Sequence, residues 1–199
     1  MTHIKSALEI ALERTEGVTG NREKLAEDNL IKEGKRIASS FLNIAEDTTE
    51  VDIKQKLKSY SGKELTWVKE GLFQALVANI VLPLDDTYRG KLLVIGRGLP
   101  EIVPDKKRLG LIFDQLGQFF DQYLENKKGM RTQLEQQFAP RLRQREAQLA
   151  KQVGQQVRLT PMQDPEFVSL LQRNMAQLDE RYSASLTELK EELRRMFDL

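Results

Sequence analysis

The chain of 199 residues contains no cysteine and a single histidine, His3. Without cysteine it can form neither a disulfide nor a thiolate metal site, and it offers no thiol nucleophile. One histidine near the start of the sequence cannot build a zinc site or a serine triad. These absences exclude the commonest hydrolase and metalloenzyme classes. They favour a non-enzymatic protein that needs neither a cofactor nor a bound metal.

The sequence also lacks a long apolar run and an excess of charge of one sign. Its longest apolar stretch, residues 75–84, contains Asn79 and Pro83 and falls far short of the roughly 20 residues that a membrane span needs. The first residues run into Glu9 within a helical pattern, which is not typical of a signal peptide. With a formal net charge of +1, no global field attracts nucleic acid or an anionic membrane. We therefore expect a cytoplasmic protein without a membrane span and without nucleic acid as its main partner.

The most informative stretch runs from Leu111 to Phe197 and predicts two long helices folded back on each other. The sequence Asp164-Pro165-Glu166 is a helix start, with an acceptor at the N-cap, proline at the first position and an acid facing the helix dipole. Apolar residues then recur with a mean spacing of about 3.6, the period of a straight helix. Residues 160–165 therefore serve as the turn of an antiparallel hairpin.

Folding the chain about this turn predicts a register for the two arms. It pairs Leu149 with Met175, Leu142 with Tyr182 and Phe138 with Leu186, because each pair lies at equal distances from the turn. The first arm has an excess of basic residues and the second an excess of acidic residues, which favours the same pairing. Pro140 interrupts the first arm, and either kinks it or starts a new helix.

The preceding residues predict a helical head. Its most apolar helix spans 63–82, and we expect the other helices to pack around it. The run Lys91–Ile95 followed by glycines indicates either a short β-hairpin near 91–103 or an extended connector. Three further helices are predicted, at 2–16, 21–45 and 50–60. Residues 17–21 are expected to break the helical pattern between the first two, and Thr49 to cap the third. The expected fold is all-α, with a head at 1–104 and a hairpin at 105–199, which could also pack as a single domain.

Two groups of charged residues suggest alternative functions. Asp85, Asp86, Arg89 and Arg97 lie in the irregular region 83–104 and could line a site for a cation or a small molecule. Aspartates after a helix end are also ordinary turn residues, and that is the simpler interpretation. The cluster Arg141, Arg143 and Arg145 is the best candidate for weak nucleic-acid association. Solvation and pairing within the molecule are the simpler interpretation of this cluster.

The leading interpretation is a helical interaction or scaffold protein that self-associates. Phe119 lies off the main apolar stripe of the first arm, and Leu170 and Phe197 lie off that of the second. Two helices alone do not cover all three, so the head or a second subunit must. A homodimer is the expected assembly, because two-fold dimers are the commonest oligomers. A further protein partner is compatible with the same surface.

Overall fold

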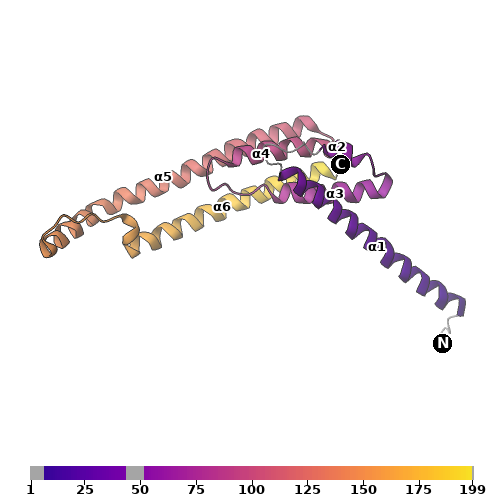
Figure 1. Cartoon of the computed structure of the whole chain (residues 1–199), viewed down its shortest axis with the longest axis horizontal. Helices are drawn as coiled ribbons and strands as arrows, with labels where there is room; N and C mark the ends of the chain where they lie inside the picture. The colour runs from indigo at the N-terminus through magenta and orange to yellow at the C-terminus, as the bar shows by residue number, and fades with distance from the viewer. Residues whose placement is uncertain (1–6, 44–51, 199) are drawn as a thin grey trace. The chain divides into compact units, whose positions relative to one another are not determined.

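The structure is a computed structural model that describes residues 7–43 and 52–198, with side chains described from Arg22 onward in the first range. His3 and Thr49, both used in the predictions above, lie outside the described residues. Every element in the described ranges is a helix, which confirms the all-α prediction (Figure 1). The elements are α1 (Ala7–Leu42), α2 (Ile53–Leu57), α3 (Gly62–Ala78), α4 (Tyr88–Gly98), η1 (Leu99–Glu101), α5 (Lys106–Val153), η2 (Pro161–Gln163) and α6 (Pro165–Phe197).

The described residues divide into two compact units. The first takes its residues from 1–80 and 93–106, and the second comprises 81–92 and 107–198. The predicted division into a head at 1–104 and a hairpin at 105–199 stays a prediction.

The first unit is built on a close contact between α1 and α3. A Cβ atom placed on Gly34 would lie 2.1 Å from the carbonyl oxygen of Val68, and one on Gly71 would lie 2.0 Å from that of Ile31. No side chain fits between the two backbones at either point, so both helices need glycine there. Val68, Leu72 and other apolar residues of α3 are buried around this contact, as its apolar sequence predicted.

Two predictions for this unit are wrong. Residues 17–21 do not break the first helix, because α1 runs from Ala7 to Leu42. Glycine costs about 1 kcal/mol in a helix but does not forbid one. The run at 91–103 is not a β-hairpin either: it forms the end of α4 followed by η1. A short apolar run does not distinguish a strand from a helix. Gly98 permits close packing here, since a Cβ on it would lie 2.9 Å from the ring of Phe41.

The second unit contains the predicted antiparallel hairpin, formed by α5 and α6 (Figure 1). Helix α5 continues through Pro140, so this proline does not start a new helix. Helix α6 begins as predicted: Asp164 is its N-cap and accepts a hydrogen bond from the backbone N–H of Glu166, and Pro165 follows at the first position. The local chemistry of these three residues was sufficient to place the helix start.

The predicted register of the hairpin is wrong. Phe138 packs on Phe167, with ring centroids 5.4 Å apart, and Tyr182 contacts Phe119 and Tyr123 instead of Leu142. Helix α5 ends at Val153, and Gly154 then turns the chain with a φ of +71°, a conformation that glycine adopts readily.

The residues after Gly154 run back along the end of α5 before α6 starts. Leu159 from this returning segment packs against the cluster of Leu134, Phe138, Leu142 and Phe167. The turn was therefore predicted too short. Leu149 and Met175, the predicted pair, are separated by roughly 30 Å along the hairpin at the usual rise per residue.

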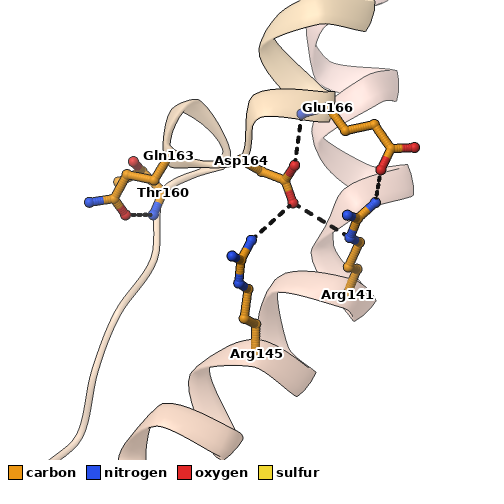
Figure 2. A network of polar contacts seen from close by, with 6 residues as sticks. All are labelled: Arg141, Arg145, Thr160, Gln163, Asp164 and Glu166. Carbon is orange, nitrogen blue, oxygen red and sulfur yellow. Dashed lines mark hydrogen bonds and ion pairs between the residues drawn. The ribbon is translucent and has the colours of Figure 1, made fainter.

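A buried carboxylate fixes the tip of the hairpin (Figure 2). Asp164 is 1% exposed, and its Oδ2 lies 3.5 Å from Nε of Arg141 and 3.8 Å from Nη1 of Arg145. Arg141 also pairs with Glu166. Before the helix, the backbone N–H of Thr160 donates to the Gln163 side chain at 2.9 Å. The ion pairs of Asp164 and Glu166 with the two arginines tie the start of α6 to α5.

Candidate functional site

The second unit carries a groove between α5 and α6, which we call the amide groove. It encloses about 480 Å³. Three glutamines of α5 occupy one face of that helix at spacings of three and four residues, and Arg181 is the only charged residue in the lining. Its lining residues are Gln115, Gln118, Phe119, Gln122, Arg181, Tyr182 and Ser185.

Two aromatic residues, Phe119 and Tyr182, line the amide groove. Phe119 and Tyr182 are both half-buried, with ring centroids 5.0 Å apart, and Tyr123 lies 5.1 Å from Tyr182 on the other side. One edge is closed by a polar chain in which Gln122 donates to Asn126 at 3.0 Å and Asn126 donates to the Tyr182 hydroxyl at 2.6 Å. The Gln122 amide and the Tyr182 ring are therefore held in place before any partner binds.

A second groove of the same unit encloses about 410 Å³, and we call it the lysine groove. The segment 81–84 flanks it with apolar side chains, of which Val81 is 59% and Leu84 is 85% exposed. Its lining residues are Val81, Leu82, Leu84, Tyr123, Lys127, Asp179, Ser183, Leu186, Thr187 and Lys190.

Two lysines and a tyrosine–aspartate pair set the electrostatics of the lysine groove. The Tyr123 hydroxyl donates to Asp179 at 2.7 Å, and burial together with this carboxylate raises the pKa of Tyr123. The Lys127 ammonium lies 5.5 Å from the centre of the Tyr123 ring. Burial lowers the pKa of Lys190. No carboxylate within the described residues forms a salt bridge with either lysine, so both positive charges are open to an anion; together with Asp179 the lining has a net charge of +1.

The two grooves lie on different faces of the hairpin. The buried stripe of α6 includes Leu178, Leu186 and Leu193. By helical periodicity, Arg181 and Ser185 of the amide groove lie on one side of this stripe, whereas Ser183 and Lys190 of the lysine groove lie on the other. A partner can therefore occupy one groove without blocking the other.

Three of the four residues of the predicted ligand site, Asp85, Asp86 and Arg89, belong to the second unit. Asp85 accepts hydrogen bonds from the backbone N–H and the hydroxyl of Thr87, at 2.9 and 2.6 Å. Arg89 pairs with Asp121, a residue that the sequence analysis did not select. Asp86 is exposed and begins the turn into α4 through its carbonyl, which accepts from the N–H of Arg89. Arg97 is exposed and belongs to the first unit, whereas the other three belong to the second.

The predicted interaction residues all lie half-buried in the second unit. Phe119 lines the amide groove. Leu170 packs against the buried cluster at the hairpin tip that includes Phe167. The ring of Phe197 lies under the Arg194 guanidinium, 5.4 Å from its centre. Of the three, Phe119 is the one that lines either of the two grooves defined above.

Two of the three arginines proposed for nucleic-acid association instead hold the start of α6 against α5. Arg141 and Arg145 both face Asp164, and only Arg143 is exposed without such a role. This arrangement supports the simpler interpretation, pairing within the molecule.

Sequence reasoning missed the glutamines of the amide groove and Lys190. A signal for the first was present: Gln115, Gln118 and Gln122 form an uncharged face around Phe119 in a chain with 31% charged residues. Nothing comparable marks Lys190, because its groove is assembled from three separate parts of the chain.

Within the described ranges, no helix combines the length and apolarity that crossing a bilayer requires. The same residues contain no group of three or more histidine or acidic side chains placed to hold a metal ion.

Searches of the curated proteins and of the solved structures found no match. A family model matches residues 54–195, so the chain belongs to a family of unknown function, DUF6657.

Proposed function

We propose that this protein is a non-enzymatic helical interaction protein that forms a homodimer through the amide groove. The observation that carries the proposal is the lining of that groove, which is uncharged apart from Arg181 and includes two aromatic rings. A cytoplasmic location is part of the proposal, and the lack of cysteine fits a reducing compartment.

The chemistry of the amide groove suits contact with a copy of itself. In a two-fold dimer the same patch is used by both subunits, so the patch must be complementary to its own copy. A glutamine amide both donates and accepts hydrogen bonds, and therefore pairs with another glutamine. Self-contact through the lysine groove would bring together four lysines and two aspartates, whereas self-contact through the amide groove brings together two arginines, so fewer like charges meet at the amide groove. Of the two grooves, the amide groove is the better dimer interface.

The aromatic residues of the amide groove supply apolar contact area, which the glutamine amides do not provide. Aromatic side chains contribute much of the binding energy at protein interfaces. Phe119 and Tyr182 are half-buried within one subunit, so part of each ring is still available to a second copy. The hairpin face is also long, since the 33 residues of α6 extend over roughly 50 Å. A second hairpin packed on this face would complete a four-helix bundle.

The test is the mass of the protein in solution at micromolar concentration. We expect twice the 22.9 kDa of one chain. Phe119→Ala and Gln118→Glu should each raise the dissociation constant at least about tenfold, through loss of the aromatic contact and through burial of a charged carboxylate in the interface, respectively. Gln172→Glu makes the same chemical change at an exposed position outside both grooves and should leave the mass unchanged. A wild-type protein with the mass of one chain would contradict the proposal.

A further inference from the structure

The lysine groove has features that the proposed dimer does not use. Lys190 is half-buried, and burial lowers its pKa, yet no carboxylate among the described residues pairs with it. A partly desolvated ammonium without a counter-ion is unfavourable, and an incoming anion relieves that cost. Lys127 provides a second charge at the Tyr123 ring. Two lysines without carboxylate partners in one groove point to an anionic partner.

The shape of the groove favours a helix over a small ion. On α6 the lining runs from Asp179 to Lys190, a span of eleven residue steps or about 16 Å, within which five residues line the groove. That length matches three turns of an α-helix laid alongside. The apolar wall includes Val81 and Leu84, whose side chains are mostly exposed and can cover the apolar face of such a helix.

We propose that the lysine groove binds an acidic amphipathic helix of a partner protein. The apolar face of that helix packs on Val81 and Leu84, and its carboxylates meet Lys127 and Lys190. Asp179 keeps its negative charge, because the Tyr123 hydroxyl that donates to it at 2.7 Å is a neutral group, so the carboxylates of the partner helix lie toward the two lysines and away from Asp179. The inference rests on the proposed role as an interaction protein and names the chemistry of a second kind of partner, which binds on another face of the hairpin.

The experiment uses the full chain and two synthetic helical peptides. One has a leucine stripe flanked by glutamates, and in the other every glutamate is replaced by lysine. We expect the acidic peptide to bind the wild type, and Lys190→Glu to weaken that binding at least about tenfold. The double variant Lys127→Glu/Lys190→Glu should lose the acidic peptide and gain the basic one. This exchange of specificity also shows that the variant is folded.

Three outcomes would overturn the inference. The acidic peptide could fail to bind at millimolar concentration, or bind the wild type and the double variant equally. Alternatively, an unstructured polyanion such as single-stranded RNA could compete as well as the peptide, which would indicate unspecific attraction of charge.

A variant in the amide groove separates this inference from the proposed dimer. Phe119→Ala should bind the acidic peptide as tightly as the wild type does, because its substitution lies in the other groove. A wild type that dimerises but does not bind the peptide refutes only the inference. A monomeric wild type that binds the peptide refutes only the dimer.

Discussion

Gly34 of α1 and Gly71 of α3 each lie against the backbone of the opposite helix. A Cβ on Gly34 would meet the carbonyl oxygen of Val68 at 2.1 Å, and one on Gly71 would meet that of Ile31 at 2.0 Å. The partner atoms belong to the backbone and cannot move aside as a flexible side chain can. The two helices would have to separate to admit even one methyl group.

We predict that Gly34→Ala and Gly71→Ala each destabilise the first unit by at least about 2 kcal/mol, because overpacked backbones must move apart. Chemical denaturation followed by circular dichroism measures the effect. Gly129→Ala is the matched control: this glycine lies inside α5 and a Cβ on it meets nothing within 4 Å. It should raise the free energy of unfolding by about 0.5–1 kcal/mol. Equal behaviour of the three variants would show that α1 and α3 do not pack as described.

A second prediction concerns Asp164 at the hairpin tip. Asp164→Ala should lower the free energy of unfolding by about 2 kcal/mol, since it removes the N-cap acceptor and leaves Arg141 and Arg145 without this carboxylate. Asp164→Asn retains an acceptor for the Glu166 N–H and should cost about half as much. Urea denaturation distinguishes the two variants. A loss that is the same for both would assign the whole effect to the charge and none to the cap.

A third prediction concerns alkaline pH and Tyr88. Burial, together with a hydrogen bond of 2.6 Å to Asp121, raises the pKa of Tyr88 to about 12. The folded protein therefore keeps the phenol proton at a pH at which the unfolded chain has lost it. This contribution is complete below about pH 10, the pKa of an unfolded tyrosine, and is lost as the pH rises to about 12.

Urea denaturation at pH 8 and pH 11 tests this linkage. We expect the wild type to lose about 1 kcal/mol more than Tyr88→Phe between these two pH values. Tyr88→Phe has every other titrating group of the wild type, so the loss of stability caused by deprotonation of the lysines is the same in both proteins and cancels in the comparison. An identical loss in both proteins would mean that Tyr88 is not held in its protonated form by the fold.

Local chemistry predicted some of this structure from sequence, and long-range packing determined the rest. Asp164, Pro165 and Glu166 carry the start of α6 in three adjacent residues, and the structure confirms it. The register depends on where α5 ends and on how the chain after Gly154 folds back, and periodicity contains no information on either. The helical end of α4 was missed because a short apolar run fits both a strand and a helix.

The candidate sites show the same limit. Phe119 could be selected because it departs from the apolar stripe of its own helix, a property visible in sequence. Lys190 could not, because its groove brings together the segment 81–84, α5 and α6. The role of Gly34 and Gly71 could not be predicted from the sequence either. Glycine destabilises an isolated helix, and the need for glycine at these two positions becomes clear only from the backbone of the opposite helix.

The central claim is that two copies of the hairpin meet at the amide groove, and the lack of cysteine allows a direct measurement. Single-cysteine variants Gln115→Cys, Gln118→Cys and Gln122→Cys, with Ser183→Cys and Thr187→Cys of the lysine groove as controls, are oxidised and run on a non-reducing gel. The account predicts a disulfide-linked dimer for at least one glutamine position and none for the two controls. Monomer at all three glutamine positions, or equal cross-linking through Ser183→Cys, would contradict it.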